Sequence, residues 1–152
     1  MNKKLAGYSF IELTVVIAII TVLAILTFPV TITELQKTRL KGTVADIASH
    51  LYQFQQNAFA MKNNKSYGLA FNQAQEKYIF YIGPNLATAE ETDEIVLQNN
   101  ITLVNINLSG GQTEITFTAG SFRPSVSGNV LFSDGSNSFS LYINGEGLID
   151  YY

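Results

Sequence analysis

The feature that most constrains this chain is an apolar run, Leu13–Thr33, that contains no charged residue. A helix of about twenty such residues spans roughly 30 Å, the thickness of the hydrocarbon core of a bilayer. The run shows no alternation of polar and apolar residues, so a strand is a poor interpretation. A run of this length is also hard to bury inside a chain of only 152 residues. It therefore predicts a helix that spans a membrane.

A second apolar pattern follows the run and keeps helical spacing. Its seven residues are separated by steps of 4, 3, 4, 3, 4 and 3, which places them on one face of an amphipathic helix: Leu40, Val44, Ile47, Leu51, Phe54, Ala58 and Met61. We interpret this stripe as domain core rather than as a surface for a partner. We expect one helix from about Tyr8 to Lys62, bent near Pro29 because proline removes a backbone hydrogen bond. Its part 8–33 would lie in the membrane and serve assembly, and its part 34–62 would pack on a domain.

Beyond Asn64 the apolar period changes to two, which is typical of strands. Runs of this kind cover residues 67–71, 77–82, 104–108, 115–117, 130–132, 139–143 and 148–151. Asp134-Gly135 and Asn144-Gly145 are hairpin signals, because tight turns need residues that tolerate positive φ. No helix separates these strands, so the sheet is antiparallel. The predicted fold class is α+β: a long N-terminal helix packed on an antiparallel β domain, residues 63–152, built from one sheet or two.

The composition excludes several classes of function. The formal net charge is −3, and two of the nine basic residues precede the apolar run. This argues against a nucleic-acid partner, which needs clustered Lys and Arg. There is no cysteine, so neither a disulfide nor a Cys-ligated zinc site can form. His50 has no clustered ligands, Ser136 has no nearby base, and the acidic segment Glu90–Glu94, interpreted as a solvated loop, matches no EF-hand spacing. We expect no enzyme, no cofactor and no metal site.

Three features coincide at the N-terminus: a short basic leader that ends in Gly7, a lone acid at Glu12, and the apolar run behind it. The residues read Lys3-Lys4-Leu5-Ala6-Gly7 and then Tyr8-Ser9-Phe10-Ile11-Glu12-Leu13. This segment resembles the class III signal of type IV pilins and type II secretion pseudopilins. The resemblance implies that a prepilin peptidase cuts after Gly7 and that the new N-terminus, Tyr8, is methylated. The family usually has phenylalanine at that position, so Tyr8 departs from it.

There is also a physical reason for each of these residue types at its position. Glycine at Gly7 lets an enzyme approach the backbone closely. Lys3 and Lys4 keep the leader in the cytoplasm by the positive-inside rule, so the part beyond the run is exported. Glu12 is costly in hydrocarbon, by about 2.5–3.5 kcal/mol at mid-span, and needs a partner. By resemblance that partner is the terminal amine of a neighbouring subunit, and Pro29 is the family's helix-bending proline.

The C-terminal half resembles the H-type minor pseudopilins and their FimT-like minor pilin relatives in its pattern of strands and turns. The matching segments are 115–117, 128–132, 134–136 and 141–149. Some FimT-like proteins bind DNA through arginines near the C-terminus. Here the tail, Gly147–Tyr152, contains no arginine, which argues against DNA binding.

The sequence thus predicts a minor pilin or pseudopilin of a type IV pilus, a type II secretion pseudopilus or a competence pseudopilus. Its partners would be other pilins, the prepilin peptidase and an inner-membrane assembly platform. It would cross the bacterial inner membrane once, with the globular part outside the cytoplasm, before joining the filament. A cleaved secretory signal fits less well, because Glu12 would lie inside its apolar region. The alternative is a membrane-anchored adhesin or ligand-binding module that does not polymerise, for which Glu12 would have no use.

Overall fold

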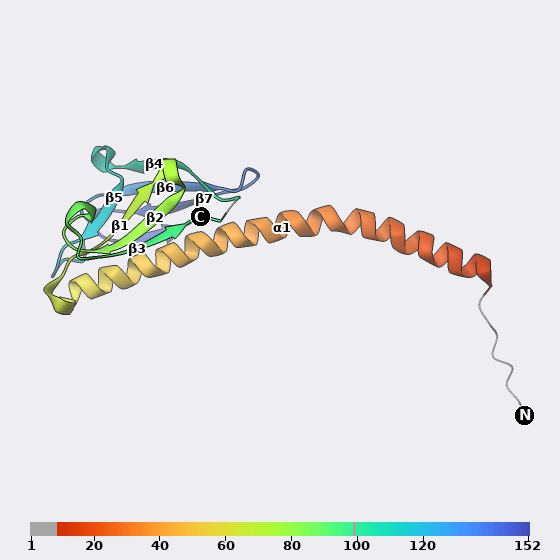
Figure 1. The fold of residues 1–152 in the computed structure, drawn as a ribbon, viewed down its shortest axis with the longest axis horizontal. Helices are drawn as coiled ribbons and strands as arrows, with labels where there is room; N and C mark the ends of the chain where they lie inside the picture. Colours follow the sequence, from red (N-terminus) through yellow and green to blue (C-terminus); the bar gives the residue numbers. More distant parts are fainter. Residues whose placement is uncertain (1–8, 99) are drawn as a thin grey trace, which may run out of the picture. The chain divides into compact units, whose positions relative to one another are not determined.

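The computed structural model describes residues 9–98 and 100–152, apart from the side chains of residues 26–33. The chain divides into two units, the first ending at Gln36 and the second formed by Lys37–Tyr152. One long helix, α1 (Phe10–Phe59), contributes to both (Figure 1). All strands belong to the second unit, so the two units are described separately.

Helix α1 ends at Phe59, slightly before the end predicted near Lys62. The chain leaves the helix through three residues with left-handed φ, namely Met61 at 53°, Asn63 at 56° and Asn64 at 54°. Asparagine tolerates this region better than most residues, so the Asn63-Asn64 pair suits a helix end. Because the helix stops early, Met61 leaves the stripe and is 58% exposed, which corrects its predicted place in the core.

The remaining stripe is confirmed as core. Five of its residues are fully buried, and Phe54 is half-buried: Leu40, Val44, Ile47, Leu51 and Ala58. The Phe54 ring lies 5.2 Å from that of Phe80 and 5.3 Å from that of Tyr67, measured between centroids. The second part of α1 therefore packs on the domain through one face, as its period predicts.

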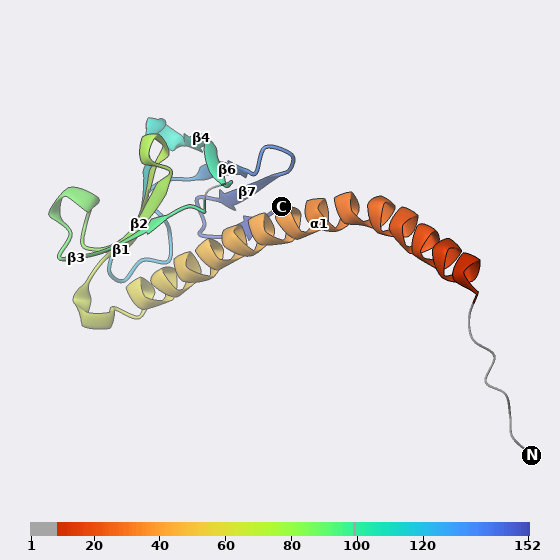
Figure 2. The same cartoon turned by 45° about the vertical axis from the view of Figure 1, so that its right-hand side comes forward.

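The domain contains two four-stranded antiparallel sheets (Figure 2). The first has the order β3-β2-β1-β5, with β1 (Tyr67–Asn72), β2 (Lys77–Ile82), β3 (Glu91–Val96) and β5 (Glu114–Phe117). The second has the order β4-β6-β7-β8, with β4 (Thr102–Leu108), β6 (Gly128–Ser133), β7 (Ser138–Ile143) and β8 (Ile149–Tyr151). Short 3-10 turns occupy Lys62–Asn64, Gln73–Gln75, Leu86–Thr88 and Ser109–Gly111. The predicted α+β class is confirmed, with two sheets.

The inner faces of both sheets and one face of α1 enclose a single core. Phe71 of the first sheet and Phe132 of the second meet across it, with ring centroids 6.3 Å apart. Phe117 and Leu141 are buried in the same cluster. Burial of this apolar surface is the main term that stabilises the domain.

The acidic segment Glu90–Glu94 is not the predicted loop. Residues from Glu91 onward form β3, which pairs with β2 in antiparallel register over its whole length. Strand β3 lies at the edge of the sheet, where charged side chains stay in water while the backbone pairs on one side. The low strand propensity of its acids is therefore overridden by pairing with a strongly apolar neighbour.

Two smaller expectations are also corrected. A register shift between Leu103 and Asn105 puts Leu103 in the core and leaves Val104 48% exposed, whereas simple alternation places Val104 inside. In the β7–β8 connection the residue with positive φ is Gly147, at 91°, rather than the predicted Asn144-Gly145 pair. The turn is longer than two residues, so its left-handed position falls later.

Candidate functional site

The first turn of α1 presents Glu12 to the surroundings. Glu12 is exposed and is the one acidic residue in this turn. A carboxylate here is favoured by the partial positive charge of the helix N-terminus. Within the described part of the chain no hydrogen bond or ion pair occupies its side chain, so the carboxylate is free to meet a group outside this chain.

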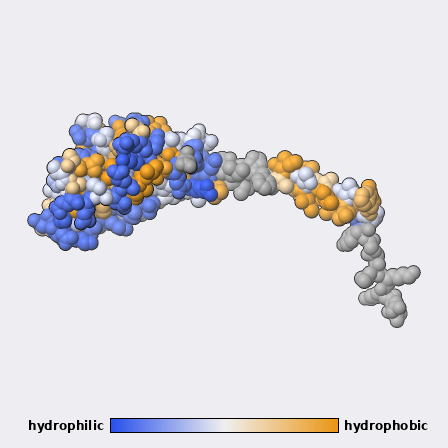
Figure 3. All heavy atoms as spheres, viewed as in Figure 1, coloured by the Kyte–Doolittle hydropathy of each residue, from blue (hydrophilic) through white to orange (hydrophobic). Residues whose placement is uncertain are grey.

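Around Glu12 the helix surface is apolar on all sides. The large apolar side chains between Phe10 and Ile25 are 46–85% exposed (Figure 3, the orange band of the first unit). The two threonines of this segment turn their hydroxyls back onto the helix, where Thr14 Oγ1 donates to the Phe10 carbonyl and Thr21 Oγ1 to the Ile17 carbonyl, each at 2.8 Å. Their polar groups are thus satisfied internally. Glu12 is the charged group of an otherwise apolar surface.

Over the described residues, no helix combines the length and apolarity needed to cross a bilayer.

The other residues predicted for processing and assembly lie outside the described part. These are Lys3, Lys4, Gly7 and Tyr8. The backbone is helical at Pro29, but its side chain is not described, and the predicted bend there stays a prediction. The structure therefore shows the position of Glu12 and tests none of the assigned roles.

Two residues of the second unit that the sequence offered for chemistry, His50 and Ser136, have the following surroundings. His50 lies edge-on against Phe80, with ring centroids 5.2 Å apart, as a packed rather than a ligating side chain. Ser136 sits in the β6–β7 turn, where its backbone N–H donates to Asp134 Oδ1 at 2.9 Å. Among residues 9–98 and 100–152, no three His, Cys, Asp or Glu side chains are grouped to hold a metal ion. In β3, Glu91 and Asp93 share one face of the strand and Glu94 lies on the other.

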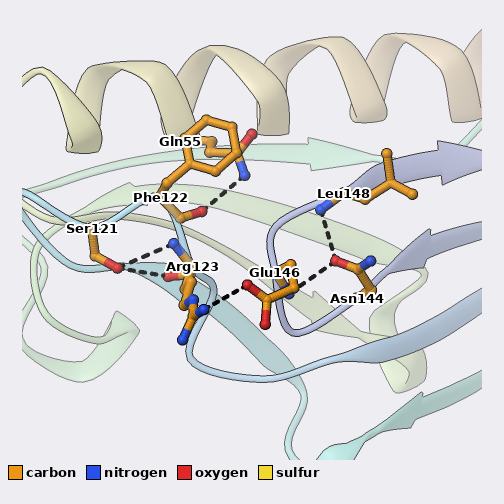
Figure 4. Close-up of polar contacts among 7 residues, drawn as sticks. All are labelled: Gln55, Ser121, Phe122, Arg123, Asn144, Glu146 and Leu148. Atoms are coloured by element: carbon orange, nitrogen blue, oxygen red, sulfur yellow. Dashed lines mark hydrogen bonds and ion pairs between the residues drawn. The ribbon is translucent and has the colours of Figure 1, made fainter.

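A buried amide that the sequence analysis missed fixes two loops against the helix. Gln55 is fully buried, and its Nε2 donates to the carbonyl of Phe122 at 2.9 Å (Figure 4). The same nitrogen also donates to the carbonyl of Gly147 at 2.6 Å. A Cβ at Gly147 would come within 2.5 Å of this nitrogen, so glycine is required there. The signal was present in the sequence, because Gln55 follows Leu51 by four residues and precedes Ala58 by three, which places it on the stripe.

The same two loops carry one surface ion pair. Arg123 Nη2 lies 2.6 Å from Glu146 Oε2, and Asn144 Oδ1 accepts from the N–H groups of Glu146 and Leu148 (Figure 4). Both charged side chains are exposed, so the pair contributes little to stability. It does pair Arg123 with a carboxylate of the β7–β8 connection, which adds to the sequence argument against a phosphate-binding surface.

Comparison with known proteins supports the architecture. No protein-family model matches the sequence, and no curated protein matches it either. The fold is similar to the solved structure of the minor pseudopilin EpsH from the type 2 secretion system of Vibrio cholerae, with a TM-score of 0.56. The similarity covers 74% of this chain and 95% of that chain at 9% sequence identity, so it establishes likeness of fold alone.

Proposed function

We propose that this chain is a pilin-like structural subunit, a minor pilin or pseudopilin, that joins a filament through the first part of α1. The observation that carries the proposal is a lone exposed carboxylate, Glu12, on a helix surface that is otherwise apolar on every side. The fold shared with a minor pseudopilin supports it.

In this function the apolar surface of α1 is buried twice, first in the inner membrane and then among the helices of sibling subunits. Processing after Gly7 releases an amine at Tyr8, and that amine of one subunit meets Glu12 of the next. Opposite charges attract far more strongly in a low-dielectric helix bundle than in water. The pair therefore sets the register between neighbours, while the apolar contacts supply most of the association energy.

A membrane-anchored adhesin or ligand-binding module that never polymerises would need the apolar surface but not the carboxylate. For such an anchor a charge in the span costs a few kcal/mol of insertion free energy and serves no function. Glu12 thus separates the two functions and is the residue to change.

The test compares incorporation of Glu12→Ala and wild-type chains into filaments that also contain sibling pilins. Glu12→Ala should insert into the membrane normally yet lose most of its incorporation, because the amine of the neighbour is left buried without a partner, at a cost of about 3–5 kcal/mol. Mass spectrometry of the incorporated wild-type chain should find an N-terminus at a methylated Tyr8. Thr14→Val is the matched control, since the Thr14 hydroxyl is already satisfied inside the helix.

Incorporation of Glu12→Ala at the wild-type level would contradict the assembly role of Glu12. A mature chain that begins beyond the apolar run would contradict the pilin-like function as a whole.

A further inference from the structure

The two sheets have four edge strands, and in three of them at least one outward backbone group is hydrogen-bonded within the chain. Along β5, the Thr116 carbonyl accepts from the Ser125 N–H at 2.8 Å, and the Thr116 N–H donates to Ser125 Oγ at 3.0 Å. Uncapped edges invite another chain to pair, and folded proteins usually block them. The edge at β5 is blocked in this way.

The two edges of the second sheet are capped by side chains. On β4, the Leu103 N–H donates to Glu76 Oε2 at 2.7 Å, and Gln73 Nε2 donates to the Val104 carbonyl at 2.9 Å. On β8, the Tyr151 N–H donates to Asp150 Oδ1 at 2.8 Å. A bulge in β4 disturbs that edge further.

The hydrogen bonds of the first sheet show which backbone N–H and C=O groups of β3 point away from β2. The Leu97 N–H donates to the Glu76 carbonyl at 2.9 Å, which fixes the pairing of β3 with β2. Successive residues of a strand direct their backbone groups to opposite sides, so every second residue of β3 bonds β2. Leu97 bonds on the β2 side, so the residues two, four and six positions before Leu97, which are the odd-numbered residues of β3, also bond β2. The even-numbered residues Thr92, Glu94 and Val96 therefore point their N–H and C=O groups away from the sheet.

A second hydrogen bond gives the same assignment of outward residues independently. The Gly83 N–H donates to the Ser66 carbonyl at 2.9 Å, which assigns the odd-numbered residues of β2 to β1 and leaves its even-numbered residues for β3. Throughout the described residues, no hydrogen bond caps the outward groups of Thr92, Glu94 or Val96. Strand β3 is thus the uncapped one among the four edges.

Hollows line the side of β3 that faces α1. One, of about 280 Å³, lies between His50, Gln53 and Phe54 of the helix and residues 91–93 of the strand. Another, of about 160 Å³, lies between Thr43 and Asp46 of the helix and residues 95–98. Side chains of an added strand would have space beside the helix near both ends of β3.

The charge around these hollows is acidic and not balanced locally. The pKa of Tyr78 is raised first by burial and then by two carboxylates, Asp46 of the helix and Asp93 of the strand. Neither forms an ion pair with any described residue. The acids on the outer face and at the start of the strand are paired instead, Glu94 with Lys77 and Glu90 with Lys65, each at 2.7 Å.

This charge also decides against a second copy of the chain as the occupant. Two β3 strands would place like charges opposite each other, which is destabilising. The other edge strands of this chain, β4, β5 and β8, contain no lysine or arginine. We propose that β3 is a docking strand whose open edge pairs with an extended, basic strand of a different protein.

The test uses the full chain in detergent micelles and a labelled short peptide that alternates lysine with threonine, followed by fluorescence anisotropy. When the peptide pairs antiparallel with β3 and its lysines lie on the same face as Asp93, its threonines lie opposite the even-numbered residues of β3. The threonine N–H groups then bond the open edge. N-methylation of the threonines should weaken binding about ten-fold or more, whereas N-methylation of the lysines should leave it unchanged. Asp93→Lys should weaken binding by a similar factor, and Glu146→Lys, which changes an exposed acid between β7 and β8, should not.

Thr92→Pro provides a test from the side of the protein. It removes one outward N–H without touching the bonds to β2, and should reduce peptide binding about ten-fold. If this variant fails to fold, the two N-methylated peptides still decide the question on the wild-type chain. Equal binding of all three peptides would overturn the proposal, because it would mean attraction by charge alone. Dimerisation of the wild-type chain without peptide, abolished in Thr92→Pro, would also overturn it by showing a second copy at the edge.

Discussion

Helix α1 carries two apolar surfaces of different kinds, and their difference explains the organisation of the molecule. Between Phe10 and Ile25 the large apolar side chains are exposed all round the helix, whereas between Leu40 and Ala58 they form one buried stripe. A stripe needs one complementary face, and the two sheets supply it. A surface that is apolar on all sides needs an apolar environment on all sides, which a domain of this size does not provide. In the proposed function other molecules supply that environment for the first part of α1, whereas the second part packs on its own domain.

The largest effect that can test this comparison comes from shortening one side chain in each part. Leu51→Ala should reduce the free energy of unfolding of the second unit by about 2–5 kcal/mol, because it leaves a cavity in a fully buried site. Ile17→Ala should change it by less than about 0.5 kcal/mol, since Ile17 is 56% exposed and contacts no core. Urea unfolding followed by tyrosine fluorescence measures both. Similar losses in the two variants would show that the parts are not independent.

A somewhat smaller effect is expected at the one polar residue of the buried stripe. Gln55→Ala leaves the carbonyls of Phe122 and Gly147 without their donor. The contact with Gly147 is buried and the contact with Phe122 only partly so, and the loss should be about 1–3 kcal/mol. Gln55→Glu keeps the shape but offers no N–H, so its loss should be at least as large. Gln53→Ala, at an exposed helical position, is the matched control and should stay within about 0.5 kcal/mol of wild type. Thermal unfolding at neutral pH would measure all three, and a neutral Gln55→Ala would exclude the amide as a structural contact.

The smallest effect concerns acid sensitivity, which should arise in the second unit. The backbone N–H of Asn137, and next that of Ser136, hold the pKa of Asp134 below its ordinary value. A carboxyl whose pKa is lower in the folded state contributes stability above its unfolded pKa and loses it as the pH falls through its folded pKa. Wild type should therefore lose more thermal stability than Asp134→Ala between neutral pH and about pH 3. Parallel Tm profiles for the two proteins would contradict this role of the turn.

The periodicities of the sequence were sufficient for most of the architecture. The 4-3 spacing that begins at Leu40 depends only on helix geometry, and the structure confirms it up to Ala58. The β domain and its antiparallel strands also followed from local patterns, although the division into two sheets stayed open. The sequence and a family resemblance singled out Glu12, and the structure adds that it stands exposed on an apolar helix.

Only the tertiary structure decided where pairing overrides local preference. Glu91–Val96 is a strand because β2 offers it a partner, not because its acids favour extended backbone. The stripe already placed Gln55 on the buried face, but only the fold brings the carbonyls of Phe122 and Gly147 to its amide. The open edge of β3 is likewise invisible in the sequence, since capping depends on which side chains the fold brings to each edge. Local periodicity fixes elements because it reports contacts within a few residues, whereas hydrogen bonding between distant segments depends on the assembled fold.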